Sequence, residues 1–207
     1  MVPNLLGISL LDEKKGVYMA YIRVKKIRKK GKDKEYRYAY LVENRWKKRV
    51  RKGSKKGARQ KVKAYLGKVH DFERIDDKEF ISHFSVDDVK EHFDEHGMAK
   101  IVKDLVRLEL MNHGFEENGD FYASGDLAVY ISNKDFFIKN LKAEKDRKIV
   151  LMMNEGFLCK ETFEKLLNFK AKGDPKEVGL SLGNTLLEAG LKVPNEIFVE
   201  MFNRVVE

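Results

Sequence analysis

The stretch Tyr36–Trp46, YRYAYLVENRW, decides the fold of the first third of the chain. Aromatic and aliphatic residues recur at every second position, the period of a β-strand with two unlike faces. A similar run, VYMAYIRVKKIR at 17–28, precedes it across a polar turn that contains Gly31. The segment RQKVKAYLG at 59–67 follows it across a basic loop. The pattern therefore predicts a small antiparallel module of three strands.

Strict alternation predicts which side chains share a face in this module. On the third strand, the apolar residues would lie on one side: Val62, Ala64 and Leu66. The others would lie on an open, basic side: Lys61, Lys63 and Tyr65. On the second strand, Tyr36, Tyr38 and Tyr40 would form a row that ends at Trp46. Two interpretations of this row stay open, a hydrophobic core or a surface on which nucleic-acid bases stack.

Positive and negative side chains are distributed unequally along the chain. The 207 residues carry a net charge of +9, but residues 14–68 hold 23 Lys or Arg and three acids. The remaining residues hold 19 basic and 30 acidic side chains. A surface that is only solvated mixes both signs, because like charges repel when packed together. The first third is therefore predicted to attract a polyanion, and a boundary is expected near residues 68–76.

The basic residues supply two groups of candidate contacts to nucleic acid. Those proposed to contact phosphates lie in the loop: Lys47, Lys48, Arg49, Arg51, Lys52, Lys55 and Lys56. A second group lies on the flanking strands, where arginine can also reach bases: Arg37, Arg45, Trp46, Arg59, Lys61, Lys63 and Tyr65.

Residues 85–124 resemble a winged helix. Ser85 is the expected N-cap of a short helix that ends at Gly97, and a longer helix over 98–114 is followed by an Asn118-Gly119 hairpin turn. The resemblance implies a recognition helix over 98–110 that offers basic side chains to DNA: Lys100, Lys103 and Arg107. Acids on the helix and the hairpin would oppose phosphates, so a structural or protein-binding role is the alternative: Asp104, Glu109, Glu116, Glu117 and Asp120.

The rest of the chain predicts extended structure over 126–138 and helices around 145–155, 160–170, 175–189 and 194–206. The expected fold class is α+β. Its predicted parts are a basic β-module, a winged-helix-like region and a helical C-terminal region: 14–70, 80–140 and 141–207.

Residues that could carry catalysis are sparse. His92 and His96 are spaced as two metal ligands on one helical face, with Asp88 one turn earlier, but no further ligand follows at a zinc-like spacing. Asp126 with Asp146 and Lys148 only loosely matches the acidic residues of metal-dependent nucleases. The single cysteine, Cys159, is expected to be a small buried hydrophobe. The sequence therefore predicts no catalytic residue, metal site or cofactor.

Three blocks of the N-terminal third follow one another in a fixed order: Tyr21-Ile22-Arg23, Tyr38–Glu43, and Arg59–Val62 continued by Tyr65–Gly67. Together they resemble the N-terminal module of some insertion-sequence transposases. The resemblance implies contact with nucleic acid in the context of a mobile element or a chromosome. It does not imply transposition, because the rest of the chain is too short for the catalytic domain of those enzymes.

The predicted function is that of a non-enzymatic nucleic-acid-binding protein, with DNA slightly favoured over RNA. An RNA- or ribosome-associated protein is the alternative, followed by a metal-dependent nuclease. The acidic C-terminal two-thirds are expected to bind a protein partner or a second copy of the chain. No signal peptide or membrane span is expected, and a cytoplasmic location is predicted. The composition also resembles that of thermophile proteins.

Overall fold

The computed structural model describes residues 8–10, 18–28, 31, 35–47, 57–132 and 135–206. The chain forms two compact units, Met1–Val69 and His70–Glu207. Helices account for 37% and strands for 34%, and the sheets are followed by C-terminal helices, so the predicted α+β class is confirmed. Within the described ranges, no helix combines the length and apolarity needed to cross a membrane.

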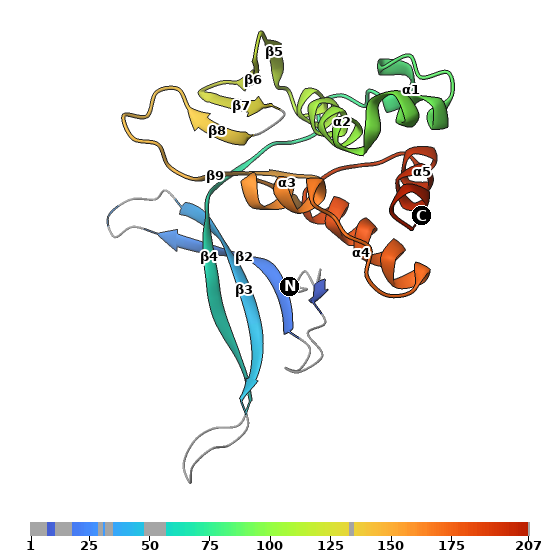
Figure 1. Ribbon diagram of the computed structural model, residues 1–207. Coiled ribbons are helices and arrows are strands. Elements are labelled where there is room, and N and C mark those ends of the chain that lie inside the picture. Colours follow the sequence, from blue (N-terminus) through green and yellow to red (C-terminus); the bar gives the residue numbers. More distant parts are fainter. Residues whose placement is uncertain are drawn as a thin grey trace. The chain divides into compact units, whose positions relative to one another are not determined.

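The first unit is an antiparallel sheet in the order β1-β2-β3-β4. Long ribbons with a pronounced twist make up β2, β3 and β4 in Figure 1. The last two residues of β4 belong to the second unit. The three predicted strands are confirmed, and β3 and β4 are longer than their sequence patterns indicate. The bounds are β1 Ile8–Leu10, β2 Tyr18–Arg28, β3 Glu35–Lys47 and β4 Gly57–Asp71.

Two irregularities in the pairing of β3 with β4 change which side chains share a face. Tyr40 pairs with Tyr65 and Val42 pairs with Val62, so two residues on β3 match three on β4. A second shift separates the Ala39 and Tyr40 pairs. Each extra residue is a β-bulge, which reverses the alternation beyond it. The predicted separation of Val62 from Tyr65 is therefore wrong, because both lie on the face of Tyr40.

In the described part of the second unit, a four-stranded sheet, the β9–β10 hairpin and five helices surround one hydrophobic core. The strands β5 to β8 form a four-stranded antiparallel sheet in sequence order, and β9 pairs with β10. The strand bounds are β5 Glu116–Asn118, β6 Phe121–Ser124, β7 Leu127–Ile131, β8 Phe136–Asn140, β9 Ile149–Met153 and β10 Gly156–Leu158. The helix bounds are α1 Phe80–His83, α2 Val89–Asn112, α3 Lys160–Leu167, α4 Pro175–Glu188 and α5 Asn195–Val206.

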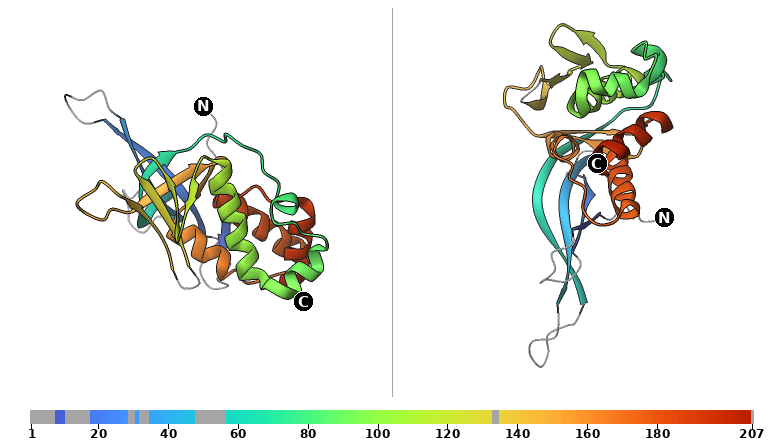
Figure 2. Two further views of the ribbon diagram at one scale, coloured as in Figure 1. Left: turned by 90° about the horizontal axis from the view of Figure 1, so that it is seen from above. Right: turned by 45° about the vertical axis from the view of Figure 1, so that its right-hand side comes forward.

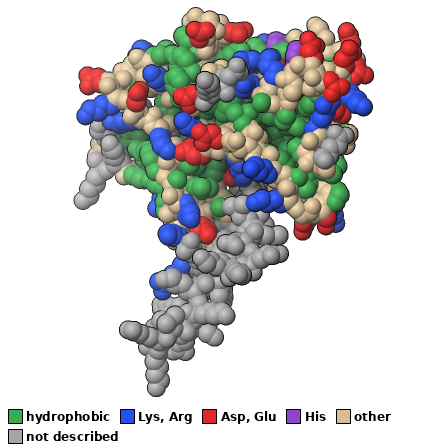
Figure 3. All heavy atoms as spheres, viewed as in Figure 1, with side chains coloured by type: hydrophobic (Ala, Val, Ile, Leu, Met, Phe, Trp, Pro, Cys, Tyr) green, Lys and Arg blue, Asp and Glu red, His purple; other side chains and the backbone are tan. Residues whose placement is uncertain are grey.

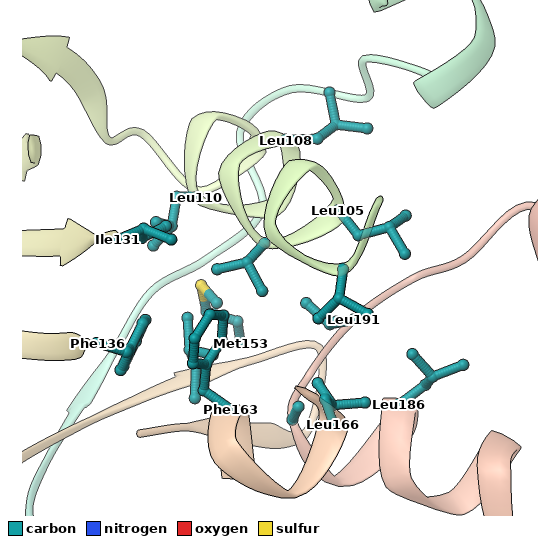
Figure 4. Packing of buried hydrophobic residues seen from close by; sticks show 14 of the residues in the cluster. Leu105, Leu108, Leu110, Ile131, Phe136, Met153, Phe163, Leu166, Leu186 and Leu191 are labelled. Atoms are coloured by element: carbon teal, nitrogen blue, oxygen red, sulfur yellow. The ribbon is translucent and has the colours of Figure 1, made fainter. Parts of the chain in front are cut away.

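Helix α2 is the centre of the second unit. It lies between the β5–β8 sheet and the C-terminal helices in the views of Figures 1 and 2. In Figure 4, Leu110 lies beside Ile131 of β7, Leu105 points to the other side of the helix, and Leu108 points away from both. All three leucines are buried, so α2 is covered on more than one side. One core thus includes residues from both of the predicted regions 80–140 and 141–207.

Two predicted helix boundaries are confirmed and one is wrong. Gly97 has φ 72° and ψ 160° and breaks α2, as predicted, and Gly114 follows the helix at φ 79°. Ser85 is not the N-cap, because it lies in a turn at φ 51°. Asp88 caps α2 instead, accepting a hydrogen bond from the Glu91 N–H at 2.8 Å.

The predicted helix over 145–155 is wrong. Residues 149–158 form the β9–β10 hairpin, with Met153 opposite Gly156 across a turn at Asn154 and Glu155. Both turn residues have positive φ, which a helix would exclude. Phe72, just after β4, donates a backbone hydrogen bond to the carbonyl of Met152 at 3.0 Å. This pairing is distant in sequence, so periodicity within the segment could not reveal it.

Candidate nucleic-acid interface

The β2–β4 part of the first unit has two faces of different chemistry, which the strand register defines. The tyrosine face, as we call it, carries the tyrosine row and its cross-strand partners. Its described members are Tyr21, Arg23, Lys25, Ile27, Tyr36, Tyr38, Tyr40, Val42, Asn44, Gln60, Val62, Tyr65 and Lys68. The opposite face carries most of the charged side chains: Lys26, Arg28, Glu35, Arg37, Glu43, Lys61 and Lys63.

Three tyrosine rings meet on the tyrosine face. The ring of Tyr65 lies 5.5 Å from that of Tyr40 and 6.3 Å from that of Tyr38, measured between centroids, and both pairs are tilted. Tyr38 and Tyr40 are half-buried, whereas 41% of Tyr65 is exposed. The rings therefore form a continuous aromatic surface and are not a sealed core.

Cations accompany these rings. The ammonium of Lys25 lies 5.2 Å from the ring centroid of Tyr40, and that of Lys68 lies 5.9 Å from the centroid of Tyr36. Both are within the range of a cation–π contact. Arg23 donates to the side-chain carbonyl of Gln60, whose amide donates to the hydroxyl of Tyr21. The tyrosine face thus combines stacking surfaces with positive charge.

The carboxylates lie on the other side of the sheet. Among the described residues of the first unit, only Glu35 and Glu43 are acidic. Glu35 lies 3.4 Å from Lys26 and 3.5 Å from Arg28, and Glu43 lies 3.5 Å from Lys63. Both acids are thus paired with lysine or arginine, and the described tyrosine face has no carboxylate.

The opposite face holds more cations than acids despite these ion pairs. Lys26 lies directly across from Arg37, and Arg59 and Lys61 are exposed on β4. Glu35 and Glu43 compensate part of this charge through their ion pairs with Lys26, Arg28 and Lys63.

The predicted contact residues fall into four groups in the structure. Arg37, Arg59, Lys61 and Lys63 lie on strands, and their side chains are partly or largely exposed on the opposite face. Tyr65 lies on the tyrosine face. Arg45, Trp46 and Lys47 are the last residues of β3, where only the backbone is described. The remaining loop residues lie outside the described ranges: Lys48, Arg49, Arg51, Lys52, Lys55 and Lys56.

Period-two alternation within each strand did not identify every cation on the tyrosine face. Arg23, Lys25 and Lys68 were not among the predicted contacts, although they lie beside the tyrosine rings. A search for cations opposite each tyrosine would have found Arg23 and Lys25, because β2 pairs with β3 without a shift. Lys68 could not be found in this way, since two bulges separate it from the loop.

The winged-helix interpretation of DNA binding disagrees with the position of α2. The predicted recognition segment is the core of the second unit, and Lys103 is only 6% exposed. Burial lowers the pKa of the Lys103 ammonium. Lys100 and Arg107 both pair with the buried carboxylate of Asp104, the latter at 2.8 Å. A helix held in this way cannot enter a DNA groove without unfolding the unit, so the recognition-helix prediction is wrong.

The surface of the second unit differs from that of the β-module. Blue and red side chains are interspersed over the face drawn in Figure 3. Many are paired, for example Lys142 with Asp126 at 2.7 Å and Lys148 with Glu161 at 2.7 Å. Such mixed charge is typical of a solvated surface. The second unit therefore offers no comparable polyanion surface in this view.

The metal-site candidates do not assemble in the described part of the chain. The rings of His92 and His96 are 4.5 Å apart, but the carboxylate of Asp88 caps α2. Burial and the neighbouring His96 lower the pKa of His92. Asp126 pairs with Lys142, and Asp146 lies in an exposed loop. No group of three or more His, Cys, Asp or Glu side chains suited to a metal occurs among the described residues.

Cys159 is buried, and we expect it to be unreactive in the folded protein. Burial raises the pKa of its thiol to about 12, and the thiol lies 3.6 Å from the hydroxyl of Thr162. Because the thiolate is the nucleophile, iodoacetamide at pH 8 should leave the native protein unlabelled for hours. The same reagent in denaturing urea should label it completely, as measured by mass spectrometry. Rapid labelling of the native protein would contradict the assigned burial.

Comparisons of the chain with protein-family models, with curated proteins and with solved structures find no match.

Proposed function

We propose that this protein binds nucleic acid without catalysing a reaction, using the basic β-module to contact phosphates. Nucleic acids carry a dense array of negative charge, and each Lys or Arg that neutralises a phosphate releases counterions. The module matches this chemistry because lysine and arginine far outnumber acids on its described strands. The cations whose side chains are described are Arg23, Lys25, Lys26, Arg28, Arg37, Arg59, Lys61, Lys63 and Lys68.

The observation that carries the proposal is the excess of cations over acids on the described strands of the first unit. Only Glu35 and Glu43 are acidic there, and both are already paired, with Lys26, Arg28 and Lys63. Exposed cations on β4 add to this excess, among them Arg59 and Lys61. A bound polyanion would supply opposite charge to such a surface.

Changing two described cations should reduce both affinity and its dependence on salt. The double variant Arg59→Ala/Lys61→Ala removes two exposed charges from β4. Log affinity for a short DNA duplex falls linearly with log salt, by roughly 0.9 per phosphate neutralised. The slope measured for the variant should therefore be smaller by up to about 1.8. Affinity is measured by fluorescence anisotropy in titrations at roughly 50 to 300 mM NaCl, a range over which salt weakens such contacts.

A charge-matched control separates local contact from net charge. Lys170 and Lys172 are exposed in a loop of the second unit, and Lys170→Ala/Lys172→Ala changes the net charge equally. This control should keep the slope of the unmodified protein. An equal loss of slope in both double variants would mean that only the overall charge matters and would overturn the assigned interface.

DNA stays the favoured partner on the strength of the transposase-like blocks, with RNA as the alternative. Competition between duplex DNA and a structured RNA at fixed salt separates the two. We assign the second unit a supporting or protein-binding role, because its central helix α2 is buried. A cytoplasmic location is proposed with it, because the single cysteine is a free, buried thiol.

The nuclease alternative is tested separately. Incubation of plasmid DNA and RNA with Mg²⁺ or Mn²⁺ should leave both intact. Metal-dependent cleavage that is lost in Asp126→Ala would overturn the non-enzymatic assignment.

A further inference from the structure

We infer that the tyrosine face binds an unpaired stretch of nucleic acid by stacking its bases on Tyr40 and Tyr65, with Lys25 and Arg23 beside the phosphates. The inference rests on the proposed function, since it assigns a surface and a strand type to nucleic-acid binding. It adds a contact to bases, whereas the proposed function requires contact to phosphates only.

The ring arrangement is the first argument. Tyr65 leans over the row at 5.5 Å from Tyr40 and 6.3 Å from Tyr38, and its exposure of 41% leaves much of the ring accessible. Tyr65 reaches this position only because a β-bulge shifts the pairing of β4, so that Tyr65 lies opposite Tyr40. Bulges re-aim side chains at functional sites. A bulge that moves a large aromatic residue from one face to an exposed position on the other suits a ligand more than a core.

The charge arrangement is the second argument. Both described carboxylates of the unit lie on the opposite face, whereas the tyrosine face carries Arg23, Lys25 and Lys68. The ammonium groups of Lys25 and Lys68 already lie over the Tyr40 and Tyr36 rings. A base that stacks on Tyr40 would take the place of the Lys25 ammonium, and the long lysine side chain would keep that ammonium within reach of the nucleotide's phosphate. Aromatic rings combined with cations, and without acids, are the composition of surfaces that bind single strands.

The spacing of the row is the third argument, and it distinguishes a single strand from a duplex. Tyr36, Tyr38 and Tyr40 recur at every second residue of β3, which separates them by ~7 Å. Stacked nucleotides in a duplex strand rise by about 3.4 Å. Bases in a duplex also present only their edges to a protein, because their faces are covered by neighbouring bases. The row can accept separated bases and cannot stack on a closed duplex.

The test compares strands that differ only in their bases. The unmodified full-length protein is titrated with a fluorescent oligothymidine, with an abasic strand of the same length and charge, and with a duplex of that length. The base-containing strand should bind about tenfold more tightly than the abasic strand. It should also bind more tightly than the duplex. Equal binding of the base-containing and abasic strands, or tighter binding of the duplex, would overturn the stacking.

Variants at Tyr65 test whether its ring carries the preference for strands with bases. Tyr65→Leu should lose about tenfold in affinity for oligothymidine and should not change affinity for the abasic strand. Tyr65→Phe keeps the ring and should bind like the unmodified protein. Tyr130→Leu, which changes a half-buried ring stacked on Phe137 in the second unit, is the matched control and should have no effect.

The outcomes also separate this inference from the proposed function. Salt-dependent binding of all three probes with no preference for bases would leave the phosphate-binding function intact and would remove the stacking contact. Absence of measurable binding to every probe at low salt would contradict the proposed function itself.

Discussion

Replacing Gly156 by alanine is expected to destabilise the second unit by about 4 kcal/mol, among the largest effects of a single substitution. A Cβ at Gly156 would lie 2.2 Å from the carbonyl oxygen of Leu187 and 2.3 Å from the backbone nitrogen of Gly190. These are backbone atoms and cannot rotate away. The β9–β10 hairpin would have to separate from the end of α4, which would open the core around Met153 and Leu186.

This effect is measured as the free energy of unfolding in urea, with helical circular dichroism as the signal. Gly183→Ala is the matched control, since it adds the same methyl group within α4. Its nearest contact would be the ring of Phe198 at 3.8 Å, an ordinary van der Waals distance. Because glycine weakens a helix interior, this control should stabilise the protein by about 0.5–1 kcal/mol. A loss below about 1 kcal/mol for Gly156→Ala would contradict the close backbone approach.

Replacing Glu109 by alanine is expected to cost about 3 kcal/mol, the second largest effect. Glu109 lies on α2 with 2% of its side chain exposed. Its carboxylate accepts hydrogen bonds from the guanidinium of Arg74 and the amide of Asn154, and it lies 3.4 Å from Nδ1 of His113. The backbone N–H of Lys192 also donates to it at 3.5 Å.

These partners come from four separate segments, which explains the size of the expected effect. Arg74 follows β4, Asn154 lies in the β9–β10 turn, His113 ends α2 and Lys192 precedes α5. Removal of the carboxylate takes away an acceptor that these partly buried hydrogen bonds share, and the loss of hydrogen bonds to a charged group is costly.

Two further variants test the role of the Glu109 charge by urea unfolding. Glu109→Gln, which keeps the shape and an acceptor, should cost less than Glu109→Ala. Glu95→Ala, on the exposed side of the same helix, should change stability by less than about 0.5 kcal/mol. If Glu109→Ala were as mild as Glu95→Ala, the assigned network would not hold the segments together.

Local sequence signals were sufficient for many elements of the fold. Period-two alternation around Tyr36 and Tyr40 predicted β3 and its neighbouring strands, because a half-buried strand requires that alternation. The expected helix over 175–189 is confirmed as α4, whose start has a capping box at Asp174 and Pro175 in the first turn. Gly97 predicted the break in α2.

Other elements depended on partners distant in the chain. Residues 149–153 are apolar without a clear period, and such a short buried run fits a helix or a strand until its neighbours are known. Burial of α2 was also not evident, since its lysines and acids suggest an exposed helix. Asp104 and Glu109 are instead buried because Lys100, Arg107 and Arg74 supply their counter-charges.

The candidate site, like the fold, was predictable from the sequence only in part. The sequence by itself determined that the first third is strongly basic, that three of its tyrosines recur along one strand, and that residues 14–68 hold only three acids. These properties follow from residue identity and from the fixed period of a strand. Only the tertiary structure decided that Tyr65 joins Tyr40 and that Lys25 and Lys68 accompany the row, with both described carboxylates on the opposite face. The physical reason is that two bulges in β4 shift its register, and bulges arise from pairing between strands and not from the alternation within one.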